Sequence, residues 1–145
     1  MPELKLSYLD ARQDRTEVLK KWVLRSIVAL AFIWIGEGKF AAHSMWIEIF
    51  ERLGFGQWLR YFTGVLQVGG GLLVLIPRTS AVGIIMLAIT MVGAMGAWVL
   101  FLGVPLAAII PGAILGGLLV VGADDLMELV SSLQKRFATP TANKR

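Results

Sequence analysis

Residues 79–123 read TSAVGIIMLAITMVGAMGAWVLFLGVPLAAIIPGAILGGLLVVGA, forty-five consecutive positions without a charged side chain. An α-helix rises about 1.5 Å per residue, so a single helix of this length would extend about 68 Å, more than twice the roughly 30 Å of a bilayer's hydrocarbon core. The stretch must therefore cross a membrane twice and turn in between. Gly103, Val104 and Pro105 mark the expected turn, because glycine and proline end helices readily.

Two more apolar stretches precede this charge-free segment. Residues 22–42 and 58–77 each offer about 20 mostly apolar positions, the length of one span, and the charge-free segment itself supplies spans at 80–102 and 105–121. Of all residues 57% are apolar and 17% are charged, whereas a soluble domain carries about 25% charged residues. We therefore predict an all-α membrane protein with a four-transmembrane-helix bundle over residues 22–122.

The charged residues gather at the two ends of the chain. Segments 1–21 and 123–145 hold 16 of the 24 charged side chains. Basic residues near span ends mark the cytoplasmic side of a membrane. Both terminal segments are basic, and so is the short connection that contains Arg78. The connection 43–57, in contrast, contains a single Lys or Arg, Arg52. Both termini are therefore predicted to be cytoplasmic. The net charge of +4 follows from this topology and from contact with anionic lipid, so no nucleic-acid partner is expected.

Two segments outside the spans show helical amphipathicity. In the first outer connection, residues 43–57, apolar side chains recur at helical spacing opposite Glu48, Glu51 and Arg52, which predicts a short interfacial helix that is either a lid over the bundle or a plain connector. In the cytoplasmic segment 123–145, an amphipathic helix is expected to lie on the membrane or to bind a partner, followed by a frayed end. Its apolar face would comprise Leu126, Leu129, Val130, Leu133 and Phe137.

Polar side chains in the expected outer half of the membrane are the candidate functional residues. Ionisable groups at this depth are costly and often mark function. The depth of these polar side chains in the membrane can be estimated by counting residues along the first and the second span. Both counts place them in the outer half, which predicts a polar cavity near the outer leaflet. As alternatives, Lys39 and Arg60 could extend to the lipid headgroups, and Glu37 could form a structural salt bridge with either of them. The candidate ligand-binding residues are Glu37, Lys39, His43, Arg60, Thr63 and Gln67.

Several chemistries are excluded or receive no support. The chain contains no cysteine, which excludes thiol redox chemistry and iron–sulfur ligation, and its one histidine is too few for a metal site built from imidazoles. No metal and no covalently bound cofactor are expected, and no residue can be assigned a catalytic role. The glycines indicate helix packing instead: Ala108, Gly112 and Gly116 recur every four residues, a pattern that allows two helices to approach closely.

Several short motifs, taken in order, resemble the DoxX-like family. The first span ends with Gly36, Gly38, Lys39 and Phe40, and the second begins after LGFGQW at residues 53–58. The second span continues with Gly64, Leu66 and the run GGLLVLIPR at residues 70–78, and MVGA follows at residues 91–94 in the third. The resemblance covers roughly residues 22–122.

This resemblance implies a small four-helix membrane bundle associated with quinone-linked oxidation, as in the membrane part of thiosulfate:quinone oxidoreductase. Other members are partners of redox-defence enzymes or assembly factors for membrane proteins. Lys39 matches the family pattern, whereas Gln67 stands where many relatives have a glutamate, which weakens the case for a carboxylate-dependent proton step at this position.

The leading hypothesis is an accessory subunit of a redox system in the bacterial cytoplasmic (inner) membrane, rather than an enzyme on its own. It would bind a small amphipathic ligand, a quinone or a lipid, and would associate with itself as a homo-oligomer or with a redox-enzyme partner. A non-catalytic scaffold or assembly factor is the first alternative. The second is a small transporter or proton pathway formed by an oligomer, because one four-helix chain is too small to build a pathway alone.

Overall fold

The computed structural model describes residues 2–41 and 43–138, with the side chains of residues 15–41 and 43–137. Within these ranges all regular structure is helical and there are no strands, so the all-α prediction is confirmed. The elements in chain order are α1 (Pro2–Phe40), α2 (Ser44–Leu53), α3 (Gln57–Leu75), α4 (Ser80–Gly96), the π-helical turn η1 (Ala97–Phe101), the 3-10 turn η2 (Pro105–Ala108) and α5 (Ile109–Ala138).

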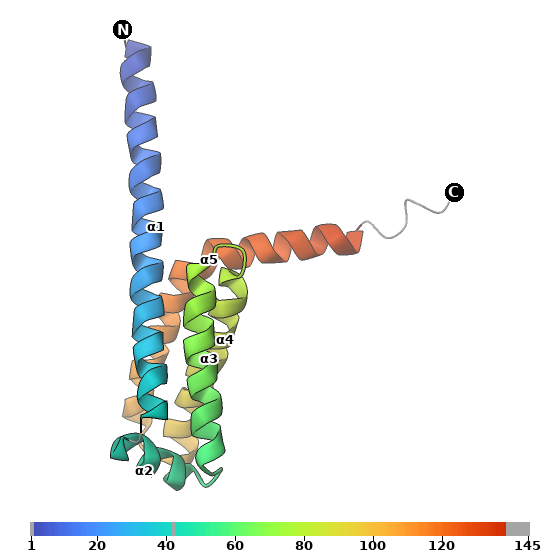
Figure 1. The fold of residues 1–145 in the computed structure, drawn as a ribbon. Helices are drawn as coiled ribbons and strands as arrows, with labels where there is room; N and C mark the ends of the chain where they lie inside the picture. The colour runs from blue at the N-terminus through green and yellow to red at the C-terminus, as the bar shows by residue number, and fades with distance from the viewer. Residues whose placement is uncertain (1, 42, 139–145) are drawn as a thin grey trace, which may run out of the picture.

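The helices form an elongated bundle with two projections (Figure 1). α1 packs against α3, α3 against α4, and α4 against the first part of α5. α2 lies across one end of this bundle, while the N-terminal part of α1 extends beyond the other end. At that second end α5 turns away and runs crosswise to the bundle, and we call this part, residues 125–138, the α5 arm.

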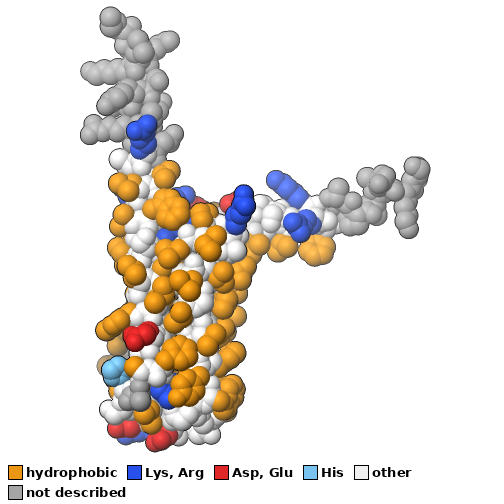
Figure 2. Space-filling model, viewed as in Figure 1, with side chains coloured by type: hydrophobic (Ala, Val, Ile, Leu, Met, Phe, Trp, Pro, Cys, Tyr) orange, Lys and Arg blue, Asp and Glu red, His pale blue; other side chains and the backbone are white. Residues whose placement is uncertain are grey.

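Within the described part of the chain, three helices have the length and composition needed to cross a membrane. They cover Gln57–Leu75, Ser80–Phe101 and Pro105–Phe137. Figure 2 shows hydrophobic side chains over the sides of the bundle, and large apolar residues such as Leu100 and Val120 are more than three-quarters exposed. Such a surface is expected where the sides of a protein face lipid. α1, which contains the first predicted span, is less apolar, because residues 22–40 include Arg25, Glu37 and Lys39.

Some helices are longer than the sequence pattern indicates. α1 begins at Pro2 rather than near residue 22, because no helix-breaking residue separates the basic segment from the apolar one. α5 likewise continues through Asp124 and Asp125, where a separate helix was expected to begin. The turn between the third and fourth predicted spans does fall at Gly103, whose φ is +66°. The expected frayed end at residues 139–145 lies outside the described residues.

The closest helix contacts occur at glycines of α1, α3, α4 and α5. A Cβ placed on Gly83 would lie 2.6 Å from the carbonyl oxygen of Gly70, so no side chain fits between α3 and α4 at this point. A Cβ on Gly36 would similarly lie 2.8 Å from Val68. In α5, a Cβ on Gly122 would clash with the Ile84 side chain, whereas a Cβ on Gly116, which belongs to the predicted small-residue pattern, would meet nothing within 4 Å. Small-residue spacing thus indicates where helices can approach, not where they do.

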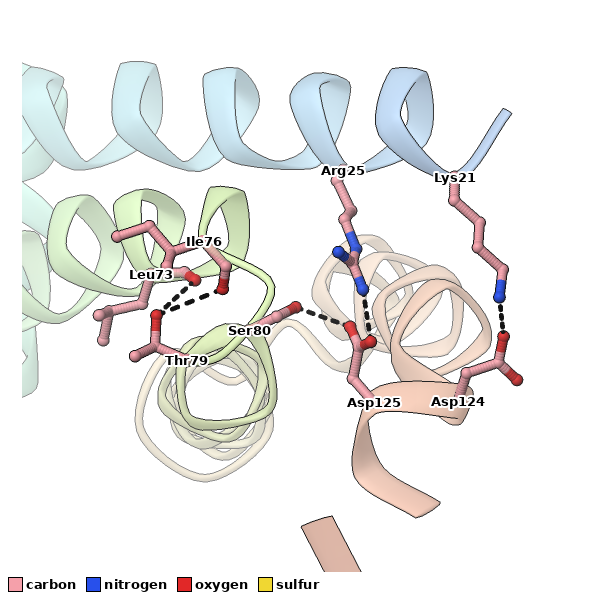
Figure 3. Close-up of polar contacts among 8 residues, drawn as sticks. All are labelled: Lys21, Arg25, Leu73, Ile76, Thr79, Ser80, Asp124 and Asp125. Atoms are coloured by element: carbon pink, nitrogen blue, oxygen red, sulfur yellow. Dashed lines mark hydrogen bonds and ion pairs between the residues drawn. The ribbon is translucent and has the colours of Figure 1, made fainter. Parts of the chain in front are cut away.

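A polar cluster joins the helices at the end from which the α5 arm departs (Figure 3). Asp125 pairs with Arg25 of α1 and accepts a 2.7 Å hydrogen bond from the hydroxyl of Ser80 at the start of α4. Ser80 is fully buried, and the Arg25 and Asp125 side chains are each only 13% exposed. Lys21 and Asp124 form a second, exposed ion pair beside this one. One carboxylate therefore holds α1, α4 and α5 together where α5 changes direction.

Candidate functional site

A cavity of about 870 Å³ lies at the opposite end of the bundle, beneath α2. Its volume is within the range of small-molecule sites, about 300–1,000 Å³. Side chains of α1, α2, α3, α4 and α5 line it, and most of them are apolar, including Phe50, Leu66, Met91, Trp98 and Ile114. Seven of the ten residues of α2 take part, so α2 closes one side of the cavity rather than only connecting two helices.

Lys39 is the buried cation of this cavity. The residue is 6% exposed, and its Nζ donates a 3.2 Å hydrogen bond to the Thr63 hydroxyl. The same Nζ lies 5.2 Å from the ring centroid of Trp46 and 5.7 Å from that of Phe50, distances at which the faces of aromatic rings attract a cation. Among the described side chains no carboxylate pairs with Lys39. An ammonium group has three N–H donors, so Lys39 keeps donors available for a ligand.

Gln67 supplies a buried polar atom without a partner. The residue is 2% exposed and lines the cavity. Its side-chain oxygen Oε1 accepts no hydrogen bond from any group in the described part of the chain. Leaving such an atom unsatisfied costs about 1–3 kcal/mol, and each case in a native structure calls for an explanation. Gln67 follows Thr63 by one helical turn, so the two polar points of the cavity are separated by about 6 Å along α3.

Arg60 lies close to the cavity but its donors point elsewhere. The residue is 4% exposed. Its Nη1 donates to the backbone oxygen of Lys39 at 2.6 Å, its Nε to the Gln57 side chain at 2.8 Å, and its Nη2 to the Tyr61 hydroxyl at 2.9 Å. A terminal carbonyl of a helix has no partner within that helix, so Arg60 acts as a cap that fixes the end of α1.

Glu37 and His43 lie apart from the main cavity. Both line a second hollow of about 430 Å³, together with Trp34 and Ser44. Glu37 and Lys39 are two positions apart on one helix, which turns their side chains to nearly opposite sides. Glu37 is exposed and forms no ion pair with the described side chains. Of the six predicted site residues, the structure therefore brings Lys39, Thr63 and Gln67 together, places Arg60 behind them, and separates Glu37 and His43.

The sequence analysis missed several residues of the cavity and of the opposite cluster. Trp46 and Phe50 were taken only as the apolar face of an interfacial helix, although both rings face Lys39. Thr90 also lines the cavity and is 7% exposed. Asp125 lies in the segment that was expected to form a separate cytoplasmic helix, but it pairs with Arg25 of α1.

These features define an α-helical membrane protein with a largely apolar cavity and a few buried polar groups. The family model of the DoxX-like family matches residues 23–122. The chain belongs to the DoxX-like family, as the sequence motifs indicated. The match ends close to Asp124, so it includes both the cavity and α2 but not the α5 arm. No curated protein and no solved structure matches the chain.

Proposed function

We propose that this DoxX-like protein binds a small amphipathic ligand, a quinone or a lipid, in the cavity beneath α2, as an accessory subunit of a quinone-linked redox system. The observation that carries the proposal is the orphan oxygen of Gln67, buried in the wall of a cavity that also holds the Lys39 ammonium. A ligand with a polar head and an apolar body matches such a site, because its head can bond to the buried polar groups and its body can pack against the apolar lining. Lys39 donates to the head, and Gln67 accepts from it.

The proposed membrane arrangement has four spans and both termini in the cytoplasm of a bacterial cell. α1 is the span that composition alone does not support, and its packing against α3 along the bundle supports its inclusion. Arg25 is paired with Asp125, and Lys39 is covered by aromatic rings, so both charges are shielded from lipid. In this arrangement α2 and the cavity lie toward the outer leaflet and the α5 arm lies at the cytoplasmic surface.

The proposed role is binding rather than catalysis by this chain alone. The cavity contains a hydrogen-bond donor, an acceptor and two hydroxyls, those of Thr63 and Thr90. Each hydroxyl donates to a backbone carbonyl, of Arg60 at 3.0 Å and of Leu87 at 2.7 Å respectively. Neither is activated by a neighbouring base, as a nucleophile requires. Electron transfer would therefore fall to the partner enzyme.

The test is ligand retention by the purified full-length protein. We expect native mass spectrometry from a mild detergent to show a bound quinone or lipid, and K39A to lose it. K20A is the matched control, because Lys20 is exposed and paired with Glu17 far from the cavity. Absence of retained ligand together with failure to bind added quinone or lipid would overturn the proposal.

A further inference from the structure

The charges that line the cavity do not balance. Lys39, Glu48 and Arg52 are the ionisable residues of its wall, which gives an excess of one positive charge. Glu48 and Arg52 are exposed residues of α2 at the rim, where water or headgroups can solvate them. Lys39 is 94% buried and has no such access. The excess charge therefore lies inside the cavity, at the Lys39 ammonium.

The surroundings of Lys39 compensate its charge only in part. The Thr63 hydroxyl accepts one hydrogen bond, and the rings of Trp46 and Phe50 add cation–π attraction. A buried ammonium without a counter-ion remains unfavourable, because neutral groups do not replace the lost hydration of a full charge. Glu37 cannot supply the missing negative charge, because it faces the second hollow on the other side of α1.

We infer that the natural ligand of this cavity is an amphiphile with an anionic head, a carboxylate or a phosphate, rather than a neutral molecule. This inference rests on the proposed function. The anionic oxygens accept hydrogen bonds from the Lys39 Nζ and neutralise its charge, while an apolar chain lies along Leu66, Met91 and Ile114. Gln67, one turn deeper on α3, accepts a hydrogen bond from a hydroxyl where the ligand carries one. A neutral quinone would leave the ammonium without a counter-ion.

The experiment compares two amphiphiles with the same apolar chain length, one with an anionic head and one with an uncharged head. We propose calorimetric titration of the delipidated full-length protein, in a neutral detergent, with laurate and with 1-dodecanol. A hydrogen bond to a charged group contributes more than one between neutral groups, so laurate should bind at least about tenfold more tightly. K39Q should abolish this preference, whereas K39R, which keeps the charge, should retain it. Lysophosphatidic acid and its uncharged monoacylglycerol counterpart repeat the comparison for a phosphate head. The affinities of lysophosphatidic acid and of laurate then show which anionic head is preferred.

The outcomes separate this inference from the proposed function. Equal binding of charged and uncharged amphiphiles by the wild-type protein overturns the anionic head but leaves ligand binding intact. Failure of both amphiphiles and of a quinone to bind overturns both proposals. Should K39Q fail to fold, the comparison of laurate with 1-dodecanol in the wild-type protein still decides the question.

Discussion

The guanidinium of Arg60 donates a hydrogen bond to the backbone oxygen of Lys39, 2.6 Å away and 21 positions earlier in the chain. This bond links the first turn of α3 to the last turn of α1. Because the Lys39 backbone is held, its side chain enters the cavity and reaches Thr63, one turn further along α3. Arg60 is therefore a positioning residue, which acts on a ligand only through Lys39.

Replacement of Arg60 by methionine should destabilise the protein and weaken ligand binding together. R60M removes three hydrogen bonds and leaves the Lys39 carbonyl without its cap, so we expect a loss of about 3 kcal/mol in the free energy of unfolding. Thermal unfolding in detergent measures the first effect and laurate titration the second. R78M is the control, because Arg78 is exposed and does not line the cavity. A variant that unfolds like the wild type would show that the cap contributes nothing.

Replacement of Gln67 by methionine should have opposite effects on stability and on binding. Methionine is similar in length and carries no oxygen, so Q67M removes the unsatisfied buried acceptor. The ligand-free protein should become more stable by about 1–3 kcal/mol. Ligands with a hydroxyl near the head should lose affinity, because their donor finds no acceptor. The measurements are the melting temperature without ligand and the shift that ligand produces. A less stable ligand-free variant would contradict the reading of Gln67 as an unsatisfied group.

Fold class was predictable because it depends on properties that a single sequence displays. The absence of charge over residues 79–123 requires two crossings whatever the tertiary contacts are. The depth of a residue along a helix is likewise countable, and this is how Lys39, Thr63 and Gln67 were grouped, three residues that all line the main cavity. The side of the helix on which a residue lies, relative to its neighbours, depends on packing. Glu37 was therefore grouped with Lys39, although the two face different hollows.

Contacts between distant segments were the part that sequence reasoning could not supply. Arg25 and Asp125 are 100 positions apart, and nothing in either local sequence indicates the other. Trp46 and Phe50 fit the pattern of an interfacial helix equally well whether they face lipid or Lys39. Each of these side chains has an adequate local explanation, and only the packed structure shows which of its possible partners it contacts.

The two ion pairs at the other end of the bundle should respond differently to salt, and the pair of Lys21 and Asp124 should also depend on pH. The hydrogen bond and charge of Lys21 hold the pKa of Asp124 below its ordinary value of 3.8, and Asp124 raises the pKa of Lys21 above 10.5. Since the folded-state pKa of Asp124 is lowered, its stabilising effect is present above pH 3.8 and is lost as the pH falls through the folded-state pKa. For Lys21 the effect is present below pH 10.5 and is lost as the pH rises through its raised pKa.

The comparison of D124N with D125N tests this difference. The small destabilisation by D124N should be constant between about pH 5 and pH 9, vanish in acid and decrease in high salt, because the pair is exposed. D125N removes the charge that pairs with Arg25 and one of the two oxygens shared between Arg25 and Ser80, which are largely buried, so its effect should be larger and should persist in salt. Melting temperatures over pH and salt series provide the measurement. Equal salt sensitivity of the two variants would mean that burial does not protect the Asp125 pair.

The α5 arm should lie on the cytoplasmic surface of the membrane that the bundle spans. In Figure 2 its hydrophobic side chains gather on the side toward the bundle, and its basic side chains lie on the opposite side. Val130, Leu133 and Phe137 are all exposed in the isolated chain. Because the arm runs crosswise where the bundle ends, its apolar side meets the level of the lipid headgroups, and Lys135 and Arg136 can contact anionic lipid from above.

The chain contains no cysteine, so single cysteines can report the depth of the arm without further changes. A spin label at L133C, in proteoliposomes with anionic lipid, should be accessible to oxygen and protected from a water-soluble nickel reagent. A label at S131C, on nearly the opposite side of the helix, should show the reverse, because residues two positions apart differ by about 200° in direction. Equal exposure of both labels to the nickel reagent would place the arm in water. Protection of L133C only in native membranes, and not in lipid alone, would assign the apolar side to a protein partner instead.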